Sequence, residues 1–276
     1  MTESKAHGSN PDSVQLLAVP GIPEVRQGDK ISNLLLNCLQ QSGIALEDGD
    51  IIALAQKVVS KAEGRIANLD EVVPGNRANE IAAITQKDPR LVELILSESD
   101  EISRMRKGAL IVRHRLGFTS ANAGIDRSNV PQDPSPPPAQ GEPNASAGEL
   151  VVLLPVDPDK SAARIAEKIF DETGVKVGVV IVDSHGRPFR LGTVGVAIGV
   201  HGVPALWDRR GETDRYGYEL QHTEVGTADE IAAAASLLMG QAAEGQPAVL
   251  LRGVNLPDIS GKAADLVRSK DLDLYR

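Results

Sequence analysis

A proline-rich stretch at residues 127–148 constrains the fold of this chain more than any other feature. It contains Pro131, Pro134, Pro136, Pro137, Pro138 and Pro143 and few apolar side chains. Proline has no backbone N–H and cannot complete a sheet ladder, and a segment with little to bury gains little by folding. We therefore expect an exposed loop or a hinge between two lobes, with the ordered structure built from the segments on either side.

Those segments alternate irregularly between strand and helix patterns. Apolar runs predict strands, and apolar residues at helical spacing predict helices. The predicted strands are residues 14–19, 51–59, 101–107, 109–115, 150–154, 177–182, 193–200 and 248–252, and the predicted helices lie at 31–39, 76–86, 89–97, 162–169 and 231–238. This order favours an α+β fold, or a mixed α/β fold, over a regular parallel wound sheet.

Length and composition limit the domain count and the class of partner. The chain has 276 residues, which we divide into a disordered polar tail (1–13), one domain (14–256) and a C-terminal extension (257–276). Its net charge of -9 argues against nucleic acid or an anionic membrane as a partner, because both favour a basic surface. The negative charge does not exclude a phosphorylated ligand, since a divalent cation can bridge carboxylates and phosphates.

The sequence also predicts where the protein is located and whether its cysteine is reactive. No segment has the roughly 18 apolar residues of a membrane helix, and the tail lacks the apolar stretch of a signal peptide, so we expect a cytoplasmic protein. The single cysteine, Cys38, lies on the apolar face of a predicted helix and is expected to be buried rather than reactive. His185 is expected to be a turn residue rather than a ligand.

Four segments place acids, hydroxyls and glycines at the ends of apolar runs, where ligands commonly bind. The first is residues 122–129. There the carboxylate of Asp126 could hold a hard divalent cation, and Asn129 could contact a nucleotide. The same residue types are also typical of an Asx-rich turn, which the pattern alone favours slightly.

The second segment follows the apolar run at residues 177–182. Asp183 and Ser184 could take a metal that binds phosphate, and Arg187 and Arg190 could meet anionic oxygens. A β-hairpin turn with Gly186 at positive φ explains the segment equally well.

The third and fourth segments have stronger structural explanations. Lys61 follows a predicted strand and could bind phosphate as a point charge, although most lysines are merely solvated. Thr227, Asp229 and Glu230 open a predicted helix, where a capping box with Thr227 as the N-cap accounts for them. A cap at Asp159 or Ser161 is expected for the helix at 162–169.

The ordered set of motifs resembles one known family. The motifs are residues 20–23 (PGIP), 59–65 (VSKAEGR), 122–129 (NAGIDRSN), 182–190 (VDSHGRPFR), 195–199 (GVAIG), 214–217 (DRYG), 228–232 (ADEIA), 238–240 (LMG) and 251–253 (LRG). Together they resemble the coenzyme F420-0:γ-glutamyl ligases from about Val14 to Val254. No motif is specific alone, but their order along the chain is.

The resemblance implies an activity and its partners. The family uses GTP and two divalent cations, Mn²⁺ or Mg²⁺, often with a monovalent ion such as K⁺. It phosphorylates the carboxylate of the phospholactyl arm of coenzyme F420-0, and the amine of L-glutamate attacks the resulting acyl phosphate; further γ-linked glutamates can follow. Members are homodimers with a two-lobed α+β fold of their own.

The resemblance also assigns residues by matching motifs, and none of them is a nucleophile. The implied metal ligands are Asp126, Asp183, Ser184 and Gln241. The implied GTP contacts are Gly21, Ile22, Pro23, Glu24, Gln56, Lys61, Asn129, Met239 and Gly240. Ser60, Arg187 and Arg190 are candidates for substrate or phosphate. Gln56 stands where relatives can carry a serine that touches the nucleotide.

Two departures and two alternatives accompany this interpretation. The proline-rich insert is longer than the connection expected in the family, and we interpret it as an exposed loop. Some bacterial relatives carry a fused nitroreductase-like domain, which we do not expect in a chain that ends at Arg276. The same acids could instead serve a metal-dependent phosphohydrolase or kinase acting on another small molecule, or a non-catalytic nucleotide-binding protein.

Overall fold

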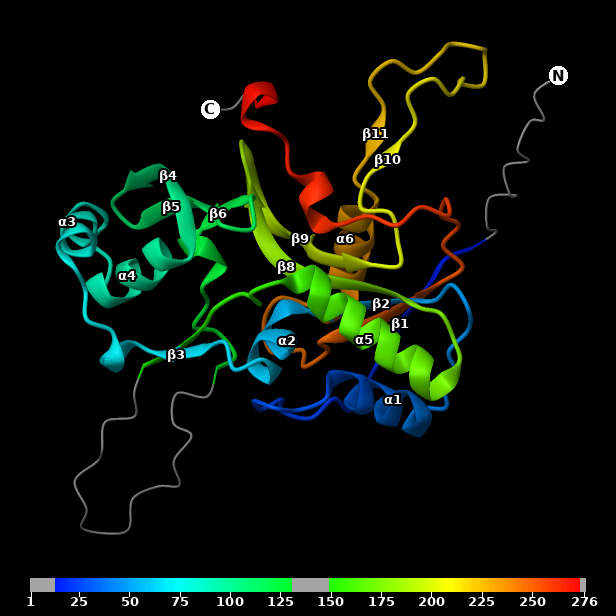
Figure 1. Ribbon diagram of the computed structural model, residues 1–276, viewed down its shortest axis with the longest axis horizontal. Helices are drawn as coiled ribbons and strands as arrows, with labels where there is room; N and C mark the ends of the chain where they lie inside the picture. Colours follow the sequence, from blue (N-terminus) through cyan, green and yellow to red (C-terminus); the bar gives the residue numbers. More distant parts are fainter. Residues whose placement is uncertain (1–12, 131–148, 274–276) are drawn as a thin grey trace, which may run out of the picture.

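The central element of the computed structural model, which describes residues 13–130 and 149–273, is a five-stranded sheet (Figure 1). Its strands follow the order β1 (Gln15–Ala18), β12 (Ala248–Arg252), β2 (Ile51–Ala55), β8 (Gly178–Arg187) and β9 (Arg190–His201). Only the β2–β8 pair within this sheet is parallel, and the other neighbours are antiparallel. The fold is therefore mixed, as an α+β prediction requires.

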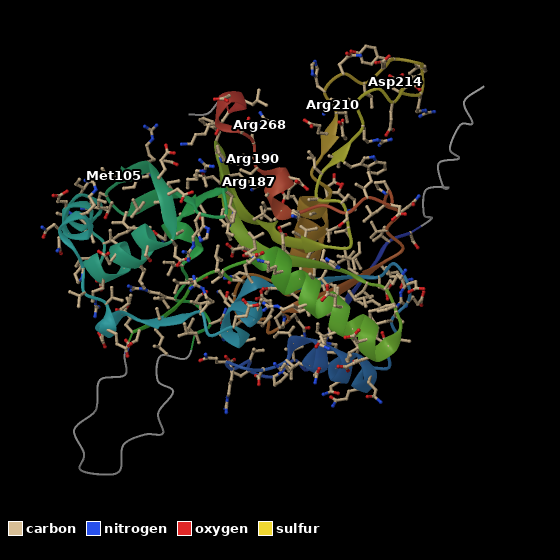
Figure 2. The ribbon with its side chains drawn as sticks, viewed as in Figure 1. Met105, Arg187, Arg190, Arg210, Asp214 and Arg268 are labelled. Carbon is tan, nitrogen blue, oxygen red and sulfur yellow. The ribbon has the colours of Figure 1, made fainter. Side chains whose placement is uncertain are left out.

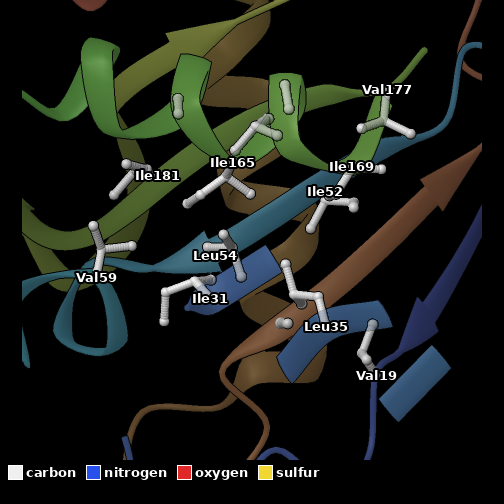
Figure 3. Packing of buried hydrophobic residues seen from close by; sticks show 14 of the residues in the cluster. Val19, Ile31, Leu35, Ile52, Leu54, Val59, Ile165, Ile169, Val177 and Ile181 are labelled. Carbon is white, nitrogen blue, oxygen red and sulfur yellow. The ribbon is translucent and has the colours of Figure 1, made fainter. Parts of the chain in front are cut away.

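Helices cover both faces of this sheet because its strands alternate their side chains. In β2, Ile52 and Leu54 pack with α1 (Ile31–Gln41), α2 (Gln56–Ala62) and α5 (Pro158–Thr173), as Figure 3 shows for the buried cluster on that face. The alternate β2 residues pack with α6 (Thr227–Met239) on the opposite face. The core is built from aliphatic side chains, as expected for a chain with few aromatics.

A third hydrophobic cluster defines what we call the small unit, residues 69–125, on the left of Figure 1. Its helices are η1 (Leu69–Glu71), α3 (Asn76–Thr85), α4 (Pro89–Ser97) and η2 (Asn122–Gly124), and its strands are β4 (Ser99–Arg106), β5 (Ala109–His114) and β6 (Thr119–Ala121). A short ladder of β3 (Ile66–Asn68) and β7 (Leu150–Val152) lies beside it. Elsewhere, β10 (Trp207–Asp208) and β11 (Glu224–Val225) form a projecting ribbon, and η3 (Ala263–Leu266) and η4 (Lys270–Leu272) lie near the C-terminus.

Two glycines of β9 let helices approach the sheet closely. A Cβ atom at Gly195 would lie 2.5 Å from the backbone oxygen of Ala232 in α6. At Gly199 it would lie 2.6 Å from Pro158, the first residue of α5. The glycines of the motif at 195–199 therefore have a packing role, because only a residue without Cβ fits under both helices.

Most predicted elements are confirmed. The five predicted helices and the hairpin around Gly108 are present, with Pro89 in the first turn of α4. Cys38 is a free, buried thiol. The strand predicted at 150–154 ends at Val152.

The strand prediction for residues 51–59 is wrong in its second half. β2 ends at Ala55, and residues 56–62 form α2, so Lys61 lies on a helix rather than at a strand end. Val58 and Val59 favour a strand by intrinsic propensity. Val59 is nevertheless buried in the cluster beneath the sheet, and this tertiary packing overrides the local preference.

The alternative that Gly186 forms a β-hairpin turn at positive φ is also wrong. β8 continues to Arg187, with Ser184 and Gly186 paired in register with β9, and Gly186 has no positive φ. The hairpin turns later, where Phe189 adopts a φ of +58°.

Both predicted helix caps are corrected. The N-cap of α5 is Asp157, whose side chain accepts a hydrogen bond from the backbone N–H of Lys160. The N-cap of α6 is Gly226, and no side chain caps that helix, so the capping box predicted with Thr227 does not form. Asp229 instead accepts a hydrogen bond from the backbone N–H of Ala197 in β9.

The predicted tail, except Ser13, and most of the proline-rich segment (131–148) lie outside the described residues. Within the part of the chain that the structure describes, no helix is both long and apolar enough to cross a bilayer.

Candidate active site

A cavity of about 710 Å³ opens at one edge of the central sheet. Because β2 and β8 are parallel and pair Ala55 with Val182, their carboxyl ends meet at this edge. The residues that follow, in α2 and in the outer half of β8, therefore emerge side by side. Most residues of the segments 22–25, 124–129 and 239–247 also line the cavity.

Most residues that the sequence singled out come together here. The cavity is lined by Ile22, Pro23, Glu24, Gln56, Lys61, Asp126, Asn129, Asp183, Ser184, Met239, Gly240 and Gln241. Gly21, Ser60, Arg187 and Arg190 do not line it. Ser60 is fully buried and donates to Gln56, whereas Arg187 and Arg190 lie at the tip of the β8–β9 hairpin (Figure 2).

Asp126 is held in place by its neighbours. Its Oδ2 lies 2.8 Å from Nζ of Lys57 in α2, and its Oδ1 accepts a 2.7 Å hydrogen bond from the backbone N–H of Ser128. Burial acts to raise the pKa of Asp126, but the hydrogen bonds and charge of Lys57 and the bonds from Ser128 lower it overall. The carboxylate is therefore ionised at neutral pH.

Asp183 and Ser184 have partners of a different kind. Oδ2 of Asp183 lies 2.8 Å from Nε2 of His185, two residues along the same strand. The Ser184 hydroxyl donates to Oε1 of Gln241 at 2.8 Å, which joins β8 to the segment after α6. Two residues that the resemblance assigns as metal ligands are thus in direct contact.

Lys61 is almost fully buried, at 6% exposure, and joins three walls of the cavity. Its Nζ donates to Oε1 of Glu24 at 2.6 Å and to the backbone oxygen of Asn129 at 2.8 Å. The Asn129 side chain in turn donates to the backbone oxygen of Ala242. A buried ammonium facing a polar cavity is suited to meet an anionic ligand.

The oxygen donors of the cavity suit a hard divalent cation. Asp126, Asp183, Ser184 and Gln241 offer carboxylate, hydroxyl and amide oxygens, and Oε1 of the cavity residue Gln246 is buried without a hydrogen-bond partner among the described residues. The described residues contain no group of three or more His, Cys, Asp or Glu arranged to hold a metal. Mg²⁺ in nucleotide sites characteristically uses one or two carboxylates together with substrate phosphates, and this donor set fits that pattern.

Sequence reasoning missed Lys57 and underrated His185. Lys57 was hidden inside a segment taken for a strand. In the structure α2 begins at Gln56, and Lys57 lies in its first turn and lines the cavity. His185 was expected in a turn, but it lies in β8 and contacts Asp183.

Comparisons with known proteins point to one family. A family model described as F420-0:Gamma-glutamyl ligase matches residues 21–253. A Methanothermobacter thermautotrophicus protein named coenzyme F420:L-glutamate ligase is 46% identical over 265 residues, covering 95% of this chain and 99% of the relative. Proteins of the same name from Methanocaldococcus jannaschii and Archaeoglobus fulgidus are 45% and 41% identical, covering 84% and 95% of this chain and 86% and 96% of the relatives.

Proposed function

Because this chain belongs to the F420-0:γ-glutamyl ligase family, we propose that this C–N bond-forming ligase joins L-glutamate to coenzyme F420-0 and consumes GTP. The observation that carries the proposal is the convergence of Asp126, Asp183 and Lys61 on one cavity from three separate parts of the chain. Its volume of about 710 Å³ lies within the range of small-molecule sites.

The proposed reaction has two bond exchanges. The acceptor carboxylate attacks the γ-phosphorus of GTP, an O–P bond forms, the bond to the β-phosphate oxygen breaks, and GDP leaves. The glutamate nitrogen then attacks the acyl carbon, so a C–N bond forms and the C–O bond to phosphate breaks. Of the three ammonium hydrogens, one stays on the amide, one goes to the phosphate and one is released. Neither step needs a protein nucleophile.

The side chains of the cavity would act by binding and positioning. Lys61, already aimed into the cavity between Glu24 and Asn129, would meet the phosphates as a point charge. Asp126 and Asp183, with Ser184 and Gln241, would hold divalent cations. When bound, such cations neutralise phosphate charge during transfer. Lys57 and His185 would orient the two carboxylates, as partners of metal ligands commonly do.

An isotope experiment tests this function. Purified protein is incubated with GTP, L-glutamate, Mn²⁺ and F420-0 carrying ¹⁸O in its carboxylate, beside an Asp183→Asn control. We expect stepwise gain of glutamyl residues by mass spectrometry and one ¹⁸O atom in each phosphate released in the first ligation. Glutamate addition without ¹⁸O in phosphate would rule out the acyl phosphate. GTP hydrolysis with intact F420-0 would instead support the phosphohydrolase.

Further properties stay predictions for this chain. The family resemblance implies a two-lobed homodimer and two bound divalent cations (Mn²⁺ or Mg²⁺), often with a monovalent ion such as K⁺. The sequence itself predicts a cytoplasmic location and a domain spanning 14–256. Light scattering after gel filtration would test the dimer, and metal analysis after dialysis would test the cations.

A further inference from the structure

A second, smaller cavity of about 310 Å³ adjoins the first. Its walls come from β9, the first turns of α5 and α6, the turn at 116–119, and the C-terminal segment at 263–273. His185 lines both cavities, so the two meet at this side chain. Nothing in the motif analysis assigned a role to this space.

The second cavity carries charges of both signs, with more carboxylates than cations among its lining side chains. Three of the carboxylates already have partners: Asp157 pairs with Lys160, Asp159 accepts from the backbone N–H groups of Val200 and Ala263, and Asp273 also has an interaction partner. Asp229 lines it at the start of α6, and although Oδ1 accepts from the Ala197 N–H, Asp229 has no ion-pair partner among the described residues. Burial raises the pKa of Asp229, an effect that a bound cation would offset. Arg268 lines the cavity from the C-terminal segment, where Figure 2 labels it, and it too has no ion pair with any described residue.

We propose that this second cavity binds the amino-acid substrate, with its ammonium group at Asp229 and a carboxylate at Arg268. This assignment rests on the proposed ligase function and adds a place for the nucleophile. An amino acid carries both charges that the walls complement, whereas a nucleotide phosphate or a simple carboxylate carries only one of them.

The sizes of the two cavities support the division. At about 310 Å³ the second cavity is at the lower limit for small-molecule sites, which suits a single amino acid and is less than half of the neighbouring 710 Å³. The larger cavity contains Lys61 and the candidate cation ligands, and so suits the nucleotide phosphates.

The position of His185 supports it as well. The imidazole contacts Asp183 in the first cavity and lies against the Phe118 ring, with the centroids 4.9 Å apart. His185 and Asp229 both line the second cavity. An ammonium at Asp229 would therefore lie at the passage between the cavities, where its nitrogen could reach an acyl phosphate formed in the first.

The proposal assigns a role to the C-terminal segment, which lies beyond the family-model match at 21–253. Residues 263–268 cover the second cavity, and a Cβ atom at Gly117 would lie 3.3 Å from the Val267 side chain, so this segment packs on the turn at 116–119. Lys270 also forms a 2.6 Å ion pair with Glu101 of β4. The segment thus closes a wall that the central sheet alone leaves open.

Steady-state kinetics on the full chain test the site. Arg268→Gln changes an exposed residue, and Asp229→Asn keeps an oxygen that can accept from Ala197, so both variants should fold. We expect each to raise KM for L-glutamate by about tenfold or more, the loss of a hydrogen bond to a charged group. Arg268→Lys should recover part of the loss, and KM for GTP and F420-0 should change by less than about twofold.

Arg106→Gln, on an exposed β4 arginine outside both cavities, is the matched control and should behave as wild type. An unchanged KM for L-glutamate in both cavity variants, or a rise confined to F420-0, would overturn the site while leaving the ligase function intact. If the wild-type protein forms no ligation product, the proposed function fails, and calorimetry with L-glutamate alone decides the site. Binding that is lost in Arg268→Gln supports it, and binding that is absent or unaffected overturns it.

Discussion

The two carboxylates that face the candidate active site are held by different kinds of structure. Asp183 lies within β8, and its backbone is paired with Val196 in the antiparallel ladder between β8 and β9, between two register shifts. Asp126 lies outside the named strands, where one isolated bridge to Val152 and the side chains of Lys57 and Ser128 hold it. One carboxylate is placed by a sheet and the other by a few contacts.

The difference shows which part of the site depends on contacts between distant segments of the chain. The cavity wall formed by β8, which we call the β8 wall, keeps its shape as long as the central sheet is folded. The wall formed by residues 124–129, which we call the Asp126 wall, depends on how the small unit packs near α2, and a buried ion network contributes to that packing. Glu98 of the small unit is 2.8 Å from Arg65, which precedes β3, and also pairs with Arg115 after β5.

Removing either carboxylate should cause the largest loss of ligation activity, and the loss should be similar for both. Asp183→Asn and Asp126→Asn each remove a candidate metal ligand while keeping side-chain volume. We expect ligation to fall by more than the roughly 10- to 100-fold typical of residues that only support a ligand. Melting temperatures should stay near wild type for Asp183→Asn. Retention of full activity by either variant would remove that residue from the proposed cation site.

Glu98→Gln should give the largest loss of stability, because it breaks the ion network behind the Asp126 wall. Burial acts to raise the pKa of Glu98, but His114, Arg65 and Arg115 bring it down to about 2, against 4.5 for a free glutamate. That difference corresponds to about 3 kcal/mol of unfolding free energy near neutral pH. Urea unfolding at pH 7 measures it, with the exposed pair residue Glu80→Gln as a near-neutral control.

The pH dependence of that loss has a definite sign. A carboxyl group whose folded-state pKa is lowered stabilises the protein above its unfolded-state pKa of 4.5 and stops doing so as pH falls through about 2. The stability difference between wild type and Glu98→Gln should therefore be constant above pH 4.5 and shrink below it. A difference that does not change with pH would assign the effect to packing instead.

The same contrast explains what the sequence could predict. Asp183 follows an apolar run directly, so its place at a strand end is a local pattern. Asp126 reaches the cavity through a bridge to Val152, across the proline-rich segment, and no local pattern encodes that pairing. The residue pattern alone slightly favours an Asx-rich turn at Asp126, and the family motif is what singles it out as a metal ligand.

Other failures have the same physical origin. α2 forms in spite of its valines because Val59 is buried beneath the sheet, and this hid Lys57. Asp229 was explained by a capping box, but its side chain bonds to β9, a partner far away in the sequence. The second cavity could not be foreseen either, because it needs the C-terminal segment to pack against the turn at 116–119.

Lys57→Met should cause an intermediate loss of activity, and it tests how far α2 holds Asp126 in place. Methionine keeps most of the apolar stem but removes the cation beside Asp126, so the pKa of that carboxyl should rise and its position should loosen. We expect kcat/KM to fall roughly tenfold, as for other partners of metal ligands, with little change in stability for a partly exposed pair. Kinetics across pH would detect the shifted pKa. Lys168→Met, which breaks an exposed pair with Asp171, is the matched control.

Ser128→Ala should have the smallest effect of the series. The change removes the hydroxyl, which donates to Oδ2 of Asp126 at 3.1 Å and accepts from Lys57, but it keeps the 2.7 Å bond from the Ser128 backbone N–H. Loss of one neutral donor to a carboxylate that keeps its cation should cost about 1 kcal/mol, a few-fold in kcat/KM.

The ratio of kcat/KM between Ser128→Ala and Lys57→Met is the informative quantity. If the backbone bond and Lys57 place Asp126, Ser128→Ala stays several-fold more active than Lys57→Met. The loss in the double variant is then smaller than the sum of the two single losses, because the hydroxyl acts partly through the lysine. Equal losses in the two single variants would mean that the serine hydroxyl orients the carboxylate as strongly as the cation does. The Asp126 wall would then depend on its own turn rather than on α2. The two walls would differ only in that a local turn supports one and the central sheet supports the other.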